Sequence, residues 1–221
     1  MISTFLFASI TINDKEAKVR ANVEPNLQRY VRSAGLKYPP KQIFVRAFKY
    51  ERQFEVWGAN SVKSELKLIK RYPILAASGT LGPKLKAGDL QVPEGWYHID
   101  RFNPYSSYHL SLGLNYPTVV ERDLARPNDP GSDIFIHGNQ KSAGCLAMGD
   151  SAIEEIYTLA KLSTHRVHVF ILPSKSNPGP IYRGARNPKF YGQIYKLNSV
   201  IDSRHRLPNL TIDRGGTYHI K

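Results

Sequence analysis

From residue 41 onward, apolar side chains recur at every second position, in short runs separated by Gly, Pro and Asn. A two-residue period is typical of β-strands with one buried face. The first two runs, residues 43–47 and 54–58, flank the polar segment 50–53 and predict a β-hairpin. A chain with this pattern is expected to be mainly β. Further strands are predicted around Leu66 and Leu68 and at residues 97–101, 108–114, 133–137 and 166–172.

Two segments have a helical period instead. Residues 25–35 begin with Pro25, place apolar side chains on one face and stop at Gly35, which predicts a short helix. Ser151 and Glu154 have the spacing of a capping box, and apolar residues then recur at helical intervals, so a second helix is predicted to begin near Ser151. The expected fold class is therefore α+β, mainly β with a few helices.

The N-terminal residues 1–12 (MISTFLFASITI) are uncharged and mostly apolar. They are similar to the end of a secretory signal but have no basic residues before them, so a first buried strand is the alternative interpretation. No stretch of the sequence approaches the roughly 18 to 20 apolar residues that a membrane helix needs. We expect residues 1–36 to form an N-terminal segment with an export-signal remnant and the short helix, residues 37–173 one domain, and residues 174–221 an extension packed on it.

The charge of the chain limits its partners. Thirty-one Lys and Arg against 18 Asp and Glu give a formal net charge of +13 and a pI near 9.8. Such a charge favours a polyanionic partner, which can be nucleic acid, anionic lipid or a carboxylate-rich wall polymer. The cations are scattered without a run of five, and no motif that reads bases is evident, so we expect no specific nucleic-acid partner.

The chemistry of the chain is expected around its single cysteine. One Cys allows neither an internal disulfide nor a multi-thiolate metal site. A predicted strand ends at His137, a polar loop spans residues 138–144, and Cys145 follows Gly144, so imidazole and thiol can face each other across the loop. A neighbouring imidazole is expected to lower the pKa of the thiol and activate it as a nucleophile, and amides around Gly144 and Cys145 can stabilise an oxyanion.

Two other interpretations of these residues stay open at this point. A lone cysteine is often a small buried hydrophobic residue, and a lone histidine at the end of a strand is often structural. A zinc site would draw on His98, His109, His137 and Cys145, but none of these has a ligand spacing such as H-x₃-H or C-x₂-C. We therefore expect no metal.

Residues 136–139 (IHGN) and 142–148 (SAGCLAM) resemble the active-site signature of the L,D-transpeptidase (YkuD) domain family, in its YafK-like branch. Residues 77–97 (ASGTLGPKLKAGDLQVPEGWY) are similar to a GPK…GD…PEG-x-Y region of that family, and residues 108–117 to the strand after it. Residues 215–220 (GGTYHI) are similar to the closing strand of the branch. The resemblance extends from about residue 40 to the C-terminus.

The resemblance implies a β-sandwich with a helix after the cysteine loop, residues 37–173 being the catalytic domain. Cys145 would be the nucleophile and His137 its base, acting without a cofactor on the peptidoglycan stem peptide next to its diamino acid. Ser142, Ala143 and Gly144 would shape the loop, Gly144 with Cys145 lending oxyanion amides. A periplasmic or cell-envelope location is expected. Candidate substrate-binding residues are Lys84, Tyr108, His109 and Asn139.

The sequence departs from the common family pattern at three points. Ala143 stands where most members have a second histidine, Ala147 stands where Arg or Asn is common, and the gap from His137 to Cys145 is short. These features favour hydrolysis of an amide link, to an attached lipoprotein or to a terminal residue. Cross-linking, lipoprotein attachment and L,D-carboxypeptidase activity remain alternatives, as does a non-enzymatic basic module that binds cell wall or nucleic acid.

Overall fold

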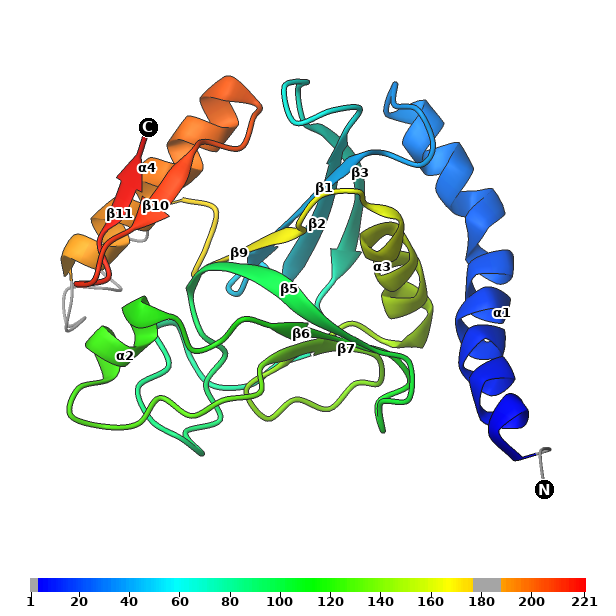
Figure 1. Ribbon diagram of the computed structural model, residues 1–221. Coiled ribbons are helices and arrows are strands. Elements are labelled where there is room, and N and C mark those ends of the chain that lie inside the picture. The colour runs from blue at the N-terminus through cyan, green and yellow to red at the C-terminus, as the bar shows by residue number, and fades with distance from the viewer. Residues whose placement is uncertain (1–3, 177–187) are drawn as a thin grey trace.

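The computed structural model describes residues 4–176 and 188–221. Within these residues a curled nine-stranded sheet is combined with four helices and a small C-terminal hairpin (Figure 1), which confirms the α+β class. The helices are α1 (Thr4–Ser33), α2 (Val119–Ala125), α3 (Asp150–Leu162) and α4 (Pro188–Arg204). The strands are β1 (Gln42–Phe48), β2 (Gln53–Ala59), β3 (Lys67–Pro73), β4 (Ala76–Ala77), β5 (Gly95–Asn103), β6 (Ser111–Leu114), β7 (Phe135–His137), β8 (Leu146–Ala147), β9 (His168–Leu172), β10 (Leu210–Ile212) and β11 (Tyr218–Ile220).

The order of strands in the large sheet is β3-β2-β1-β9-β5-β6-β7-β8-β4. Strands β1 and β2 form the predicted hairpin, with Val45 opposite Val56. Two pairs are parallel, β1 with β9 and β7 with β8, and the other neighbours are antiparallel. The β7–β8 pair lies near one end of the sheet. His137 is the last residue of β7, and Cys145 immediately precedes β8.

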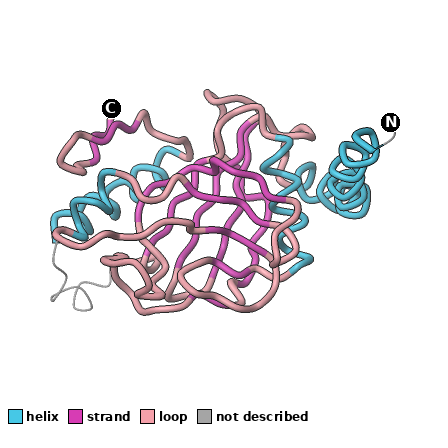
Figure 2. The backbone as a smooth tube through the Cα atoms, turned by 60° about the horizontal axis from the view of Figure 1, so that its bottom comes forward, coloured by secondary structure: helices cyan, strands magenta, loops and turns pink. Residues whose placement is uncertain are grey.

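Helices cover the sheet on both sides. In Figure 1, α3 and α1 lie on one side of the strands and α4 with the β10–β11 hairpin on the other, and Figure 2 shows the strands again between the helices near the two ends of the chain. Strand β1 is buried along its whole length, because Ile43, Val45 and Ala47 join one apolar cluster while Phe44 and Phe48 join the other. The sequence pattern revealed only the first of these two faces.

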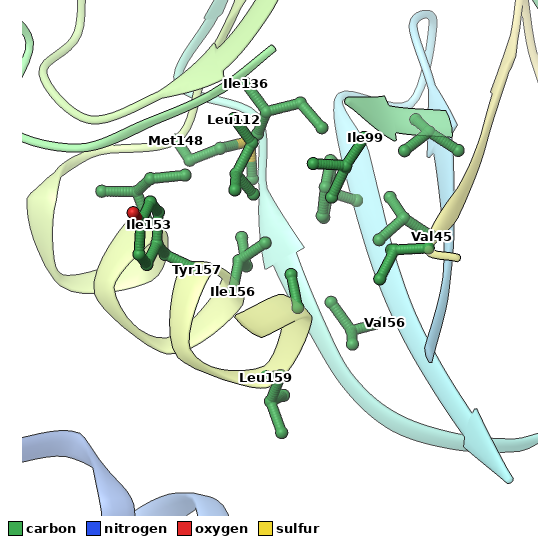
Figure 3. Packing of buried hydrophobic residues seen from close by; sticks show 14 of the residues in the cluster. Val45, Val56, Ile99, Leu112, Ile136, Met148, Ile153, Ile156, Tyr157 and Leu159 are labelled. Atoms are coloured by element: carbon green, nitrogen blue, oxygen red, sulfur yellow. The ribbon is translucent and has the colours of Figure 1, made fainter. Parts of the chain in front are cut away.

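The cluster beneath α3 anchors the strands that carry the site. Ile153 and Ile156 of α3 lie on the side of the helix that faces Leu112 of β6 and Ile136 of β7 (Figure 3), and Leu159 belongs to the same cluster. All five side chains are essentially inaccessible to solvent. Burial of each such side chain stabilises the fold by about 1.5 to 3 kcal/mol, so the backbone of β7 is held firmly.

The cluster beneath α4 contains polar pairs as well as apolar side chains. Phe190, Ile194 and Leu197 of α4 pack on the sheet, and beside them Lys49 Nζ lies 2.9 Å from Glu94 Oε1. The Tyr191 hydroxyl donates to the other carboxylate oxygen of Glu94 (3.0 Å). These contacts join α4 to the segment that precedes β5.

The N-terminal segment differs from its prediction. One helix, α1, runs through the whole of Thr4–Ser33 with Pro25 inside it, so both the helix start at Pro25 and the alternative of a first buried strand are wrong. Val19, Val23, Leu27 and Val31 recur at intervals of four and are buried against the α3-side cluster. This packing maintains the helix through Pro25, although proline removes one backbone donor. None of the described helices combines the length and the apolarity that a membrane span requires.

Two helix boundaries also differ from their predictions. Helix α3 begins at Asp150 with Gly149 as its N-cap, and because glycine has no side chain the helix has no side-chain cap. Glu154 pairs with His109 instead (Oε1 to Nε2, 2.8 Å). A capping box is present instead at Thr118 and Glu121 of α2, a helix that the sequence analysis missed. Helix α4 was missed as well, and residues 177–187 of the predicted extension, with Tyr182, lie outside the described residues.

Candidate active site

The register of β7 and β8 brings His137 and Cys145 to the same face of the sheet. These parallel strands align Ile136 with Leu146 and His137 with Ala147. Ile136 and Leu146 point into the α3-side cluster, so the alternation of side chains turns His137 to the opposite face. Cys145 immediately precedes Leu146 and therefore lies on the face of His137, as its diagonal neighbour. The structure thus brings together the two residues singled out in the sequence.

His137 is held in one orientation by its surroundings. Its side chain is buried, with 3% of the residue exposed, and the Tyr108 ring lies against the imidazole at a tilt of 34°, with 4.7 Å between centroids. Nδ1 lies 2.6 Å from the carbonyl oxygen of Gly138. A carbonyl only accepts, so Nδ1 carries the hydrogen and Nε2 has the free lone pair. Burial lowers the pKa of His137, so the ring is neutral near pH 7 and can accept a proton at Nε2.

Cys145 is partly buried at the start of β8. Its Sγ lies 3.9 Å from the carbonyl oxygen of Asp133. Burial raises the pKa of the Cys145 thiol, and the Asp133 carboxylate adds to this, while a hydrogen bond with the Phe135 backbone and the charge of Lys84 oppose it. The expectation of a lowered pKa is therefore wrong, since desolvation of the thiolate outweighs the groups that favour it.

A serine not identified from the sequence organises the loop before Cys145. Ser78 Oγ accepts the amide hydrogen of Gly144 (2.6 Å), and the Ser78 amide donates to Ser142 Oγ (3.1 Å). Ser142 Oγ in turn donates to the carbonyl of Cys145 (2.6 Å), and Gly144 adopts a φ of +100°, which disfavours any side chain. The Gly144 amide is therefore engaged, and it does not point to an oxyanion as expected. Ser78 lies in the family-like stretch 77–97, which was the available signal for it.

The four candidate substrate-binding residues have different surroundings. Tyr108 covers His137, as described above. Lys84 is buried and pairs with Asp89 and with the carbonyl of Lys86. His109 turns to Glu154 of α3. Asn139 holds the loop to α3, because its amide donates to Asp150 Oδ1 (2.7 Å) and its carbonyl accepts from Gly149 (2.9 Å).

A cavity of about 480 Å³ lies near the cysteine loop, without Cys145 itself in its lining. Its lining includes the two residues whose charges act on the thiol, Lys84 and Asp133, together with Ala143 of the cysteine loop. Asp133 is paired with Arg101 (2.9 Å), and Lys84 with Asp89, whereas Asp129 presents a carboxylate that accepts only a backbone amide, that of Gly131, in the described residues.

The residues of the zinc alternative are not gathered in one place. His98 lies on β5 opposite His168 of β9, away from the β7–β8 pair. Among the described residues, no group of three or more His, Cys, Asp or Glu side chains is arranged to hold a metal ion.

The chain was compared with known proteins. The L,D-transpeptidase catalytic domain (YkuD) matches residues 50–171. YafK of Escherichia coli K12, a protein named as an L,D-transpeptidase, is 32% identical over 117 residues, which cover 52% of this chain and 46% of YafK. This match thus spans about half the length of that relative.

Two solved structures were also similar. The helical cell shape determining protein Pgp2 of Campylobacter jejuni is 15% identical with a TM-score of 0.49, over 85% of this chain and 80% of Pgp2. The L,D-transpeptidase 1 of Mycobacterium tuberculosis is 13% identical with a TM-score of 0.33, over 59% and 62%. The family match covers more than half of the 221 residues and includes both His137 and Cys145. The chain therefore belongs to the L,D-transpeptidase catalytic domain family.

Proposed function

We propose that this protein is a cysteine-dependent enzyme that attacks the peptidoglycan stem peptide next to its diamino acid and hydrolyses an amide link there. The observation that carries the proposal is the placement of Cys145 and His137 on one face of neighbouring strands, with Nδ1 of His137 bound to the Gly138 carbonyl. Family membership and the similarity to YafK support the substrate class. A site of action in the cell envelope follows from that substrate.

The neutral pair defines the order of proton transfers. Sγ of Cys145 attacks the scissile carbonyl as its proton passes to Nε2 of His137, and the C–S bond forms. The resulting oxyanion is stabilised by the amide of Cys145, the donor we assign because the Gly144 amide is engaged by Ser78. The imidazolium then gives its proton to the leaving nitrogen, the C–N bond breaks, and a thioester and a free amine remain.

Water completes the proposed reaction. Nε2 takes a proton from a water molecule, whose oxygen attacks the thioester, and the C–S bond breaks to return the thiol and release a carboxylic acid. Ala143 lines the cavity near the cysteine loop, and Ala147 is buried opposite His137 on the same face. Neither offers a polar group to hold an amine acceptor, which favours water over aminolysis. A lipoprotein or a terminal residue is the group we expect to be released.

The cavity near the cysteine loop suits a diamino acid. The free ammonium group of the diamino acid would lie against Asp129, whose carboxylate has no cationic partner in the described part of the chain. The net charge of +13 would also bring the protein to the carboxylates of the wall, through attraction that weakens as salt increases.

Mass spectrometry of purified sacculi tests this function. Sacculi with attached lipoprotein are incubated with the wild type and with Cys145→Ala, and the muramidase digest is analysed. We expect stem peptides with a new free carboxyl group after the diamino acid, from the wild type alone. New cross-linked dimers without hydrolysed peptide would identify a transpeptidase instead. Salt-sensitive retention on sacculi with no chemical change in either sample would support the wall-binding alternative.

A further inference from the structure

Lys15 of helix α1 contacts a loop at the candidate active site. Its ammonium donates to the carbonyl of Pro104 (2.6 Å) and to that of His109 (2.8 Å). One side chain therefore joins the two ends of the loop formed by residues 104–109. Helix α1 lies outside the family match, so this contact belongs to a part of the chain that the family comparison does not describe.

The loop 104–109 in turn contacts both His137 and the residue that orients it. The Tyr108 ring lies against the His137 imidazole at a tilt of 34°. A Cβ atom at Gly138 would lie 2.6 Å from the Tyr108 carbonyl oxygen and 3.1 Å from His109 Cβ, so the loop backbone presses against Gly138. Any displacement of the loop therefore changes the surroundings of the imidazole and of the Gly138 carbonyl that accepts from it.

Few other side chains restrain this loop from outside. His109 has a left-handed φ of 72°, which a residue other than glycine rarely adopts without external contacts. Those contacts are Glu154 of α3 on the His109 ring and Lys15 of α1 on the His109 carbonyl. Helix α1 is itself fixed to α3, since Glu16 accepts from the Tyr157 hydroxyl and pairs with Lys161. The loop is thus held between two helices.

We propose that Lys15 is a positioning residue for the thiol–imidazole pair. It closes the loop 104–109 so that the Tyr108 ring stays against His137 and the imidazole keeps the orientation that proton transfer from Cys145 requires. The inference rests on the proposed function for its catalytic consequence. The geometric part of it can be measured without any substrate.

The primary test is the ring-current shift of His137, measured by NMR on protein with labelled histidine. A carbon-bound imidazole hydrogen over the Tyr108 face resonates upfield, and Tyr108→Ala identifies the size of that shift. Lys15→Met keeps the length of the side chain and removes its donors. We expect Lys15→Met to lose most of the upfield shift, Lys15→Arg to retain it, and Lys15→Met with Tyr108→Ala to match Tyr108→Ala alone.

A matched control lies on the same helix. Lys18→Met removes an exposed lysine that pairs with Asp14, and it should keep the wild-type shift. An unchanged shift in Lys15→Met, or an equal loss in Lys18→Met, would overturn the specific role of Lys15.

The catalytic consequence is tested separately on sacculi or a stem-peptide substrate. Lys15→Met should reduce kcat by about tenfold with little change in KM, because misplacement of a catalytic group weakens the chemical step more than binding. If the wild type had no activity, the proposed function would be wrong, but the NMR result on the position of Tyr108 relative to His137 would still hold. An active wild type with equal kcat in Lys15→Met would overturn the positioning role.

Discussion

Two sets of buried polar groups in this protein are neutralised in different ways. Beneath α4, charge is paired with charge: Lys49 with Glu94 at 2.9 Å, and Arg46 with Glu55 at 3.0 Å. At the β7–β8 pair, His137 has a backbone carbonyl as its partner, and the Cys145 thiol has backbone groups of Asp133 and Phe135 as its partners. The ion pairs of the first set stabilise the packing of the sheet against α4. The thiol and imidazole of the second set are uncharged, and a proton can pass between them.

The difference follows from the cost of burying a charge. Burial lowers the pKa of Lys49, and the Glu94 carboxylate 2.9 Å away opposes that shift. Burial lowers the pKa of His137, and it raises that of Cys145 by more than the charge of Lys84 lowers it. Both groups are therefore neutral at rest, and the proton passes from sulfur to nitrogen only when a substrate carbonyl is attacked.

The largest expected effect is on activity, and it distinguishes the Cys145–His137 pair from the buried ion pairs beneath α4. Cys145→Ala and His137→Ala should each reduce the release of stem peptide by about 10⁴-fold or more, and the double variant should lose no more, since the two groups act as one unit. In urea denaturation, Cys145→Ala should change the free energy of unfolding by less than about 1.5 kcal/mol, whereas His137→Ala removes a buried ring and should lower it by about 2 to 4 kcal/mol. Substantial activity in His137→Ala would show that another base serves.

The next effect is on the free energy of unfolding, to which the buried ion pairs beneath α4 are expected to contribute strongly. Lys49→Met leaves the Glu94 carboxylate buried without its cation, and we expect a loss of about 3 to 5 kcal/mol in the free energy of unfolding. Lys67→Met is the matched control, because Lys67 pairs with Glu65 at the surface and should contribute less than about 1 kcal/mol. Similar urea midpoints for the two variants would contradict the structural role assigned to the buried pair.

A smaller effect is expected where the loop of the site meets β4. Ser78→Ala removes the acceptor of the Gly144 amide, and the loss of about 1 to 1.5 kcal/mol in loop order should reduce kcat by about fivefold to tenfold. Ser61→Ala is the control, since Ser61 makes a similar hydroxyl pair with Ser64 far from Cys145 in the chain. Equal rates for wild type and Ser78→Ala would leave Ser78 without a catalytic consequence.

Strand and helix periodicity predicted much of the sheet. Helix α2 was missed although its capping box, Thr118 and Glu121, is a local signal, and the other failures have a common cause. The hairpin of β1 and β2, strands β5 and β9, and helix α3 all appear near their predicted residues. The full length of α1, the helix α4 and the start of α3 depend on packing or on contacts between distant residues. Such contacts leave no local signal; Glu154, for example, pairs with His109, which lies 45 residues away in the sequence.

The site was predictable to a similar extent. His137 and Cys145 are close in sequence, so a strand, a loop and a second strand necessarily bring them near each other. Ser78 reaches Gly144 from 66 residues away, and Lys15 reaches His109 from 94 residues away, which no spacing rule detects. The direction of the Cys145 pKa depended on burial, and the sequence does not give burial.

The most direct test of the neutral pair is the rate at which iodoacetamide alkylates Cys145 between pH 5 and 10. Because the chain has one cysteine, the reaction reports this thiol alone. The structure predicts a rate that tracks a single ionisation with a pKa above the ordinary 9.0 and that shows no plateau near neutral pH. A rate that stays constant down to below about pH 7, and that loses this plateau in His137→Ala, would show a preformed thiolate–imidazolium pair and contradict the account.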